Sequence, residues 1–318
     1  MNRPLRDMDR HSIIISDREH GLPFSKGLTA NSVMAAGLSP ARAYHVAQVV
    51  EDRLRRLGQD EVTAGELRII TADTIREEEG DRYAQSYLQW QTVSDLDIPL
   101  IILIGGGTGV GKSTLATQLA ARLGIVRIIS SDAIREVMKG VLTSDIMPTL
   151  HTSSFNAGEV VQHTLAPGED PVVVGFREQV QAVAVGVQAL IDRAVTEQQD
   201  VIIEGAHVVP GFVHAAVGDA AVVVQLVVTV DDEDLHRSHF YVRAHESRSR
   251  PVERYLQHFD NIRKIQRHVK SLALQHGVPV VANYNLDIML AQVIEQVVSR
   301  ATEAAGKPKL GVAGGGGR

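Results

Sequence analysis

The chain has 318 residues, which is long for one domain and comfortable for two, and 44% of them are hydrophobic. Its formal net charge of −6 argues against a protein whose main partner is nucleic acid or an anionic membrane. The absence of cysteine excludes disulfides, thiolate zinc sites and cysteine nucleophiles. The start of the chain is polar, and its most apolar stretch, residues 215–230, is too short for a membrane span. We therefore expect a cytoplasmic protein that works on small molecules.

Residues 1–92 differ from the rest of the chain in their pattern of apolar and charged residues, and they carry no catalytic motif. Strand-like runs at Ser12–Ile15 and Leu67–Thr71 surround helical segments of mixed charge. A short helix is expected at Asn31–Ala36. The helix expected after it has one apolar face, formed by Ala43, Val46, Val50 and Leu54. The pattern predicts a small mixed α/β domain, separated by a polar run from what begins at Pro99.

From Pro99 onward strands and helices alternate, which predicts an α/β fold with a parallel sheet and helical crossovers. Apolar runs predict strands at Leu100–Ile104, Val126–Ile129, Val201–Ile203, Val222–Val230 and Val278–Val281. Helices are predicted at Ser113–Leu123, Ala133–Lys139, Arg177–Thr196, Asp232–Ala244, Val252–His276 and Asp287–Ala304. The long connection Thr143–Gly175 has little periodicity, so we expect it to be functional. The glycine-rich tail at 307–318 is expected to be disordered.

A glycine-rich turn follows the first of these strands, within the stretch IPLIILIGGGTGVGKST. From Gly106 to Ser113 the turn fills the pattern G-x-x-x-x-G-K-[ST], whose backbone N–H groups wrap nucleotide phosphates. Lys112 is expected to reach the β- and γ-phosphates of ATP, and the Ser113 hydroxyl to ligate Mg²⁺. A glycine-rich turn without a ligand is the alternative. The predicted nucleotide-binding residues are Gly106, Gly107, Thr108, Gly109, Val110, Gly111, Lys112, Ser113 and Thr114.

Two carboxylates come at the ends of predicted strands, which line the active crevice of such sheets. Asp132 can accept the proton of an acceptor hydroxyl there, while Arg135, one helical turn on, pairs with an anionic group of the acceptor. The alternative for Asp132 is a helix cap. Glu204 ends an apolar strand abruptly, as an acid does that orients Mg²⁺ or the attacking group. A structural carboxylate is the alternative for Glu204, and we interpret His207 in the following loop as structural.

Basic residues gather between residues 231 and 270, where nine Lys and Arg stand against seven acids. They are Arg237, Arg243, Arg248, Arg250, Arg254, Arg263, Lys264, Arg267 and Lys270. Guanidinium groups hold phosphate bidentately, so the cluster predicts a mobile lid in which Arg237 and Arg243 assist catalysis. A solvated helix face with ion pairs is the alternative. The histidines of the same stretch lack the spacing and the partners of a zinc site.

Several separated motifs carry a resemblance to a known family. They are Pro23–Gly27, Ile104–Thr114, Ser130–Arg135, Ser153–Phe155, Ile203–Gly211, and Tyr255 with Ile262-Arg263. In this order they resemble the 2-phosphoglycerate kinase family, best known from methanogenic archaea, over most of the chain. Residues 1–92 look like an ATP-cone, a small nucleotide-binding domain. The resemblance implies that residues 93–306 form a P-loop NTPase domain of the nucleoside-monophosphate-kinase type.

The resemblance also implies a reaction, in which the γ-phosphoryl group of ATP passes, with Mg²⁺ present, to the free hydroxyl of 2-phosphoglycerate. The products would be 2,3-bisphosphoglycerate and ADP. The catalytic residues implied are Lys112, Asp132, Glu204, Arg237 and Arg243; Ser113 and Glu204 would hold the metal; Asp132, Arg135, Ser153, Ser154 and Arg263 would bind the acceptor.

Other functions stay open from the sequence alone. The acceptor could be another phosphorylated polyol or sugar acid, such as an inositol phosphate. A nucleotide-sensing regulator without an acceptor is a second alternative. A kinase of nucleic-acid ends is disfavoured by the net negative charge and by an aromatic content of 4%, which leaves little for base stacking. We expect a small phosphorylated acceptor as the partner, no nucleic acid and no membrane, and a homo-oligomer remains open.

Overall fold

The computed structural model describes residues 13–17, 20–94, 98–214, 218–246 and 252–305. The tail expected at 307–318 lies outside these residues. The chain divides into two compact units, one of Met1–Asp95 with Arg122–Gly124 and one of Leu96–Ala121 with Ile125–Arg318. Among the described residues, no helix combines the length and the apolar character needed to cross a bilayer.

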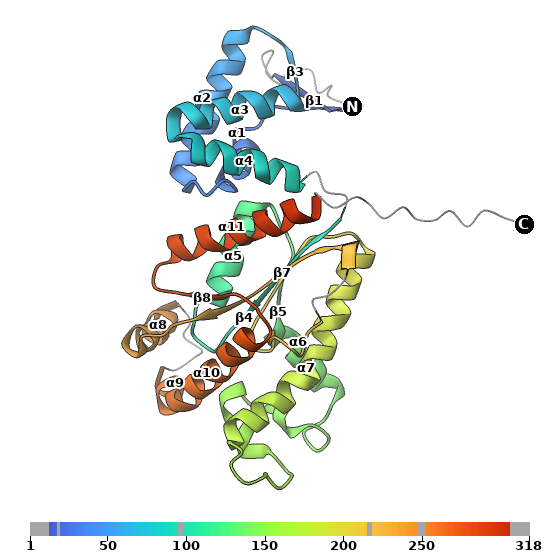
Figure 1. Cartoon of the computed structure of the whole chain (residues 1–318), viewed down its shortest axis with the longest axis vertical. Coiled ribbons are helices and arrows are strands. Elements are labelled where there is room, and N and C mark those ends of the chain that lie inside the picture. The colour runs from blue at the N-terminus through green and yellow to red at the C-terminus, as the bar shows by residue number, and fades with distance from the viewer. Residues whose placement is uncertain (1–12, 18–19, 95–97, 215–217, 247–251, 306–318) are drawn as a thin grey trace, which may run out of the picture. The chain divides into compact units, whose positions relative to one another are not determined.

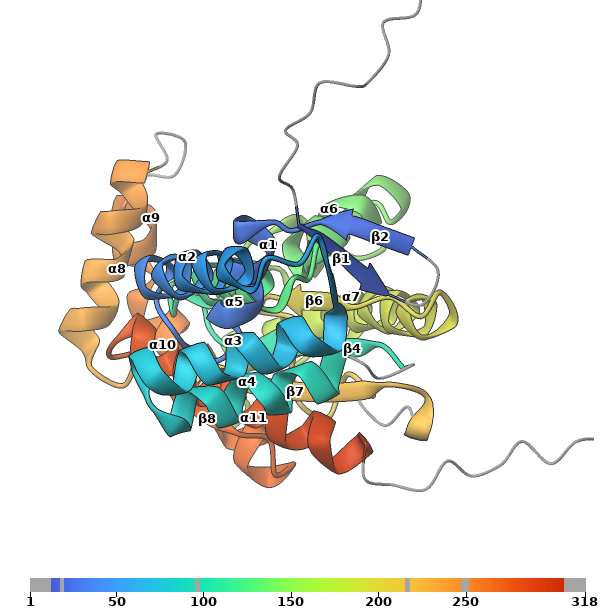
Figure 2. The same cartoon turned by 90° about the horizontal axis from the view of Figure 1, so that it is seen from above.

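The N-terminal unit combines a small sheet with helices, as the sequence predicts. In chain order its elements are β1 (Ile14–Asp17), β2 (His20–Pro23), α1 (Lys26–Met34), α2 (Pro40–Leu57), β3 (Glu61–Thr63), α3 (Ala64–Glu79) and α4 (Asp81–Ser94). The strand order is β2-β1-β3, with β1 antiparallel to β2 and parallel to β3. Figure 2 shows β1 and β2 together with helices α1 to α4.

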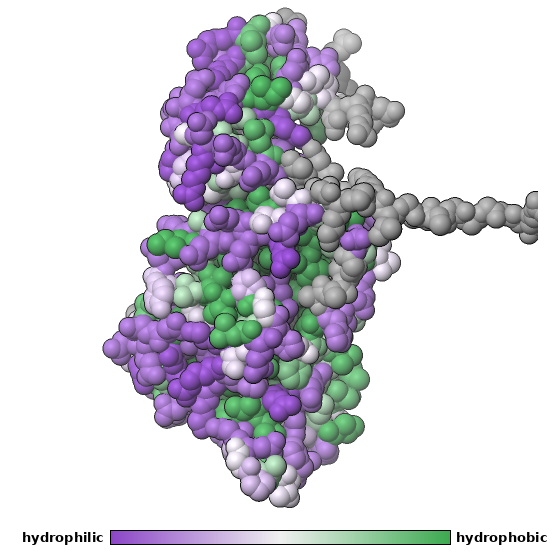
Figure 3. Space-filling view, viewed as in Figure 1, coloured by the Kyte–Doolittle hydropathy of each residue, from purple (hydrophilic) through white to green (hydrophobic). Residues whose placement is uncertain are grey.

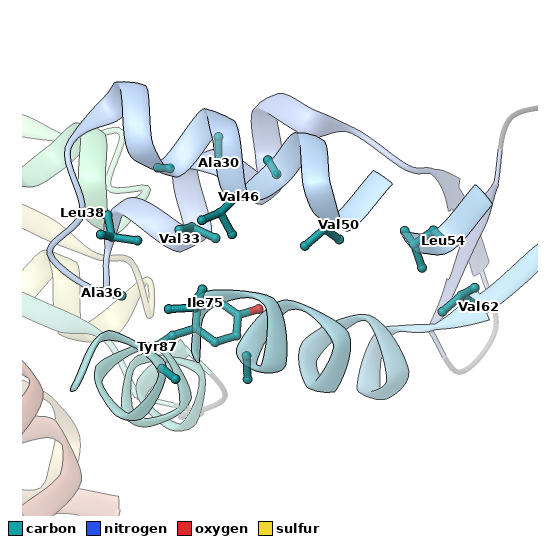
Figure 4. Close-up of a cluster of buried hydrophobic side chains, with 14 of the residues drawn as sticks. Ala30, Val33, Ala36, Leu38, Val46, Val50, Leu54, Val62, Ile75 and Tyr87 are labelled. Atoms are coloured by element: carbon teal, nitrogen blue, oxygen red, sulfur yellow. The ribbon is translucent and has the colours of Figure 1, made fainter. Parts of the chain in front are cut away.

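Helix α2 supplies much of the hydrophobic core of this unit. Pro40 occupies its first turn, and Gly58 ends it in the left-handed conformation with φ 66°. The predicted apolar face is confirmed, because Val46 and Val50 are fully buried and lie opposite Ile75 of α3 (Figure 4). Each such valine stabilises the unit by roughly 1.5–3 kcal/mol. The visible surface of the unit is mostly hydrophilic (Figure 3).

The strand expected at Leu67–Thr71 is wrong, because these residues lie in α3. A capping box begins that helix: the Glu66 N–H donates to Thr63 Oγ1 (3.2 Å), and the Glu66 carboxylate accepts from the Thr63 N–H (2.9 Å). Leu67 and Ile70, three residues apart, then pack against the core on one helical face. The start signal overrides the β-forming composition of the run.

The second unit contains the predicted parallel sheet, and the predicted fold class is confirmed. Its elements are β4 (Leu100–Gly105), α5 (Lys112–Leu123), β5 (Ile128–Ser130), α6 (Ser131–Val141), the 3₁₀ turns η1 (Pro148–His151) and η2 (Ser154–Val160), α7 (Pro171–Thr196), β6 (Val201–Glu204), η3 (Gly218–Ala220), β7 (Val222–Thr229), α8 (Glu233–Glu246), α9 (Val252–Gln257), α10 (Phe259–Gln275), β8 (Val280–Ala282) and α11 (Leu286–Ala305). The strand order is β5-β6-β4-β7-β8, and every pairing is parallel.

Strand β4 lies at the centre of the sheet and is buried along its whole length. Ile101 and Leu103 pack against α6 and α7 on one face, where α10 also lies. Figure 1 shows α5 and α11 on the opposite face. Because all the strands are parallel, their carboxyl ends meet at one edge: Ile104 pairs with Glu204, and Glu204 pairs with Ser130.

Two segments of this unit differ from the predicted pattern of helices and connections. The helix expected over Val252–His276 is divided into α9 and α10 at His258. His258 lies beside Phe155 of η2, with ring centroids 5.6 Å apart, and its Nε2 is 3.3 Å from Asn156 Nδ2. The division is therefore made by tertiary contacts. The long connection Thr143–Gly175 holds η1, η2 and the first turn of α7, and its inner part packs against α7 and α10.

Candidate active site

The glycine-rich loop joins β4 to α5 in a conformation that only glycine adopts readily. Gly106, Gly109 and Gly111 have φ angles of 138°, 82° and 93°. A Cβ at Gly106 would also lie 2.4 Å from the Val228 carbonyl oxygen of β7. The loop thus needs glycine both for its backbone angles and for its close approach to the neighbouring strand.

Lys112 and Ser113 stand at the first turn of α5, which begins at Lys112. The Lys112 side chain is buried, and its Nζ donates to the Gly107 carbonyl across the loop (2.6 Å). The Ser113 hydroxyl donates to Glu204 Oε1 at 3.0 Å, which brings the loop to the end of β6. A helix N-terminus with free N–H groups is a favourable place for phosphate.

Glu204 is largely buried at the carboxyl end of β6, and Ser113 Oγ is the hydrogen-bond partner found for its carboxylate. This pairing of a hydroxyl with a carboxylate suits Mg²⁺, which takes oxygen ligands and keeps several of its waters. Within the described residues no group of three His, Asp or Glu side chains could hold a metal ion by itself. The donor set therefore fits an ion shared with a nucleotide and does not fit a closed metal cage.

Asp132 lies in the first turn of α6, but it is not the helix cap. Ser130 is the N-cap residue, and its Oγ accepts from the Asp132 N–H (3.2 Å). The Asp132 carboxylate is exposed and lies 3.7 Å from Arg135 Nε. Arg135 is mostly buried, and its Nη1 donates to the carbonyls of Leu150 (2.9 Å) and Thr152 (3.1 Å). Asp132 and Arg135 are thus brought together, with Asp132 open to a ligand.

A buried polar network, which the sequence did not reveal, supports this pair. His207 is fully buried, and burial lowers its pKa to about 4, so the ring is neutral at pH 7. Its Nδ1 accepts from the Ser131 hydroxyl (3.0 Å), and its Nε2 donates to Gln179 Oε1 (3.0 Å). Gln179 in turn donates to the carbonyls of Thr149 and Thr152. The interpretation of His207 as structural agrees with these contacts.

Gly205 makes room for this network. It has φ 148°, and a Cβ there would lie 1.9 Å from Ser131 Oγ. Glycine after Glu204 therefore allows α6 to approach the end of β6. The one local signal for this network in the sequence was the Glu-Gly pair at the end of an apolar strand. The partners of His207 could not be found in this way, because Gln179 and Ser131 are 28 and 76 positions away from it.

The two serines expected to bind the acceptor lie at the start of η2. Ser153 is the residue before it, and its Oγ accepts from Arg254 Nη2 at 2.8 Å. Arg254 also lies over the Phe155 ring, 5.9 Å from its centroid. Ser154 is half-buried at the first position of the turn. Arg254, a member of the basic cluster, is thus placed beside the predicted acceptor residue Ser153.

The other predicted arginines have different surroundings. Arg263 donates to the carbonyls of Val230 (2.5 Å) and Asp231 (2.8 Å), just after β7. The Arg237 guanidinium lies over the Phe259 ring, 3.8 Å from its centroid. Arg243 belongs to α8 by its backbone, and its side chain lies outside what the structure describes. Neither Arg237 nor Arg263 is seen bonded to the phosphate loop itself, and their expected roles stay predictions.

A parallel sheet whose central strand runs into a G-x-x-x-x-G-K-S loop, with an acid at the next strand end, defines a P-loop nucleotide-binding domain. Comparison with protein families agrees: residues 100–267 match an AAA domain, and residues 13–96 match the ATP cone domain. Among solved structures, a shikimate kinase from Acinetobacter baumannii aligns with a TM-score of 0.36 and 17% identity, covering 65% of this chain and 97% of that one.

Relatives found by sequence comparison identify the family more specifically than the domain matches do. The 2-phosphoglycerate kinase of Methanothermobacter thermautotrophicus is 37% identical over 294 residues, which cover 92% of this chain and 96% of the relative. The 2-phosphoglycerate kinase of Pyrococcus furiosus is 39% identical over 94% of this chain and 97% of its own length. The chain belongs to the 2-phosphoglycerate kinase family, and the resemblance noted from its motifs is confirmed.

Proposed function

We propose that this protein transfers the γ-phosphoryl group of ATP to the free hydroxyl of 2-phosphoglycerate. The observation that carries the proposal is one juxtaposition at the sheet edge. The Ser113 hydroxyl of the phosphate loop bonds Glu204, and Glu204 pairs in register with Ser130, two residues before Asp132. Groups suited to the nucleotide and a carboxylate suited to the acceptor hydroxyl thus meet at neighbouring strand ends.

The loop N–H groups and Lys112 bind the phosphates of ATP and offset their charge. Ser113 and Glu204 would hold Mg²⁺, which supplies charge neutralisation when it is bound. The acceptor hydroxyl oxygen forms a bond to the γ-phosphorus while the bond from that phosphorus to the β,γ-bridging oxygen breaks. Asp132 accepts the hydroxyl proton, and ADP leaves. Most of the catalytic effect comes from positioning and charge.

The acceptor carries a phosphate and a carboxylate, so its site must supply cations and hydroxyl donors. Arg135 and Ser153 would take this role. Two observations support it: Arg135 donates to the Leu150 carbonyl of η1 and lies 3.7 Å from Asp132, and Ser153 accepts from Arg254 just before η2. Arg263 is held by two carbonyls after β7, which favours a positioning role for it. Arg237 and Arg243 are proposed to act from α8 when the acceptor is bound.

The test is ADP release by the full chain with Mg·ATP and a panel of acceptors: 2-phosphoglycerate, 3-phosphoglycerate, glycerate, inositol phosphates and none. Turnover that depends on 2-phosphoglycerate and is strongly reduced in Lys112→Ala supports the proposal. Turnover on another phosphorylated acceptor keeps the kinase mechanism and replaces the substrate. Tight ATP binding without turnover on any acceptor overturns the proposal and favours a nucleotide sensor.

A further inference from the structure

The carbonyl oxygens of the phosphate loop are held from outside by side chains. Those of Gly107, Thr108, Gly109 and Val110 each accept one side-chain hydrogen bond. The donors are Lys112 Nζ (2.6 Å), His236 Nε2 (2.8 Å), His239 Nδ1 (2.9 Å) and Asn283 Nδ2 (3.0 Å), respectively. Three of the donors come from α8 and from the end of β8, far from the loop in sequence. The sequence showed the two histidines only as residues unfit for zinc.

His236 is built into this arrangement. It is fully buried, with its ring 5.3 Å from that of Phe240 and 5.4 Å from that of Phe259. A carbonyl can only accept, so Nε2 carries the proton and Nδ1 is the acceptor that faces Arg263 Nη1 at 3.4 Å. Burial lowers the pKa of His236 to about 4, which keeps the ring neutral at pH 7.

Asn283, which follows β8, completes the arrangement. Its own N–H donates to the Thr229 carbonyl at the end of β7 (2.8 Å), which fixes its backbone. A Cβ at Gly111 would lie 2.5 Å from Asn283 Nδ2, and one at Gly109 would lie 2.5 Å from the Phe240 ring. The loop glycines therefore also give the amide and the α8 side chains access to the loop carbonyls.

We propose that His236, His239 and Asn283 are positioning residues for nucleotide binding, and we call the three the carbonyl collar. By holding one side of successive peptide groups, the collar keeps the opposite side, with its N–H groups, turned toward the phosphates. It also connects the loop to α8, the helix that carries Arg237 and Arg243. The proposal rests on the proposed function in one respect, namely that the loop binds nucleotide phosphates.

The geometry of histidine and its carboxamide analogues provides the test. Asn places its Nδ2 as many bonds from Cα as histidine places Nδ1, so His239→Asn retains the donor, whereas His239→Gln misplaces it and His239→Ala removes it. The measurements are the Kd of Mg·ADP by calorimetry and the KM values for ATP and the acceptor. We expect Ala and Gln to weaken ADP binding and raise KM for ATP about three- to tenfold, the worth of one hydrogen bond. His239→Asn should restore both to within about twofold, and KM for the acceptor should not change.

A second pair of variants separates the collar from general destabilisation. Asn283→Asp replaces a donor by an acceptor against the Val110 carbonyl and should weaken ADP binding more than His239→Ala does. Asn285→Ala is the matched control, because the Asn285 side chain accepts from the N–H groups of Asp287 and Ile288 at the start of α11. It should lower the melting temperature with no change in ADP affinity.

Any one of three results would overturn the proposal. They are wild-type ADP affinity in His239→Ala, no recovery of ADP affinity in His239→Asn, and equal losses of ADP affinity in Asn283→Asp and Asn285→Ala. Because ADP binding is measured directly, a failure of the collar proposal can be distinguished from a failure of the proposed function. A protein that binds ADP but phosphorylates no acceptor refutes the proposed function and leaves the collar to be decided by the variants. A wild-type chain that binds no Mg·ADP overturns both.

Discussion

Asp132 and Glu204 have different surroundings although both lie at the carboxyl ends of neighbouring parallel strands. Glu204 is nearly buried and bonded to Ser113, while Asp132 is exposed beside Arg135. The sequence located both carboxylates because a charged residue at or shortly after the end of an apolar β-run is a local signal. It could not identify His207 or Ser131 as their support, since contacts across 76 residues leave no trace in local pattern.

Lys112→Ala should lower kcat by about 10²–10³-fold, the usual cost of removing a group that stabilises developing charge. The fold should persist, because the Lys112 side chain donates to the Gly107 carbonyl within the same loop and lies at the first turn of α5. ADP release and a thermal unfolding curve check both statements. Turnover at the wild-type rate in Lys112→Ala would remove the proposed mechanism.

Asp132→Asn should reduce kcat by about 10²–10⁴-fold, the range for loss of a general base. ADP affinity should not change, because Ser130 caps α6 and the Asp132 carboxylate is exposed. Steady-state kinetics together with calorimetry separate the two quantities. A loss of ADP affinity with kcat retained would instead indicate that Asp132 acts only on the local structure of α6.

At the scale of elements, continuous apolar runs predicted the strands of the second unit well. The five strands described in the second unit were predicted to within a few residues, because each contains an apolar run. The run Leu67–Thr71 was mistaken for a strand, since a capping box decides that segment. The division of α9 from α10 was missed, because it depends on contacts of His258 with η2. The functional prediction for Thr143–Gly175 stays a prediction, although Arg135 and Ser153 have their contacts there.

Thr63→Ala should lower the free energy of unfolding by about 1 kcal/mol, since it removes the N-cap of α3. Thr63→Ser keeps the capping hydroxyl and should restore most of that loss. Chemical denaturation of the full chain, followed by far-UV circular dichroism, measures both. Equal stability of Thr63→Ala and Thr63→Ser would show that the capping box does not determine the start of α3.

At the scale of the whole molecule, two buried neutral histidines make stability depend on pH. Burial lowers the pKa values of His207 and His236 to about 4, whereas an unfolded histidine titrates near 6.5. Between these values the unfolded chain binds protons that the folded chain does not, so stability is complete above pH 6.5 and falls as the pH decreases to about 4.

The free energy of unfolding should therefore fall across that window by up to about 1.4 kcal/mol per pH unit for each histidine. His207→Gln should reduce the slope by one histidine's share, whatever its absolute stability. The exposed variant His214→Gln is the control and should keep the wild-type slope. Urea unfolding at several pH values measures this slope. An unchanged slope in His207→Gln would contradict the lowered pKa of His207.

The strand order β5-β6-β4-β7-β8 divides the catalytic edge of the sheet into two halves. The donors of the carbonyl collar follow β7 and β8, whereas Asp132 and Arg135 follow β5, and Arg135 donates to the carbonyls of Leu150 in η1 and of Thr152 after it. The two halves meet at β4 and β6, through Ser113 and Glu204. Under the proposed function, exchanging residues 148–160 should therefore change acceptor selectivity while ATP binding by the loop between β4 and α5 is retained.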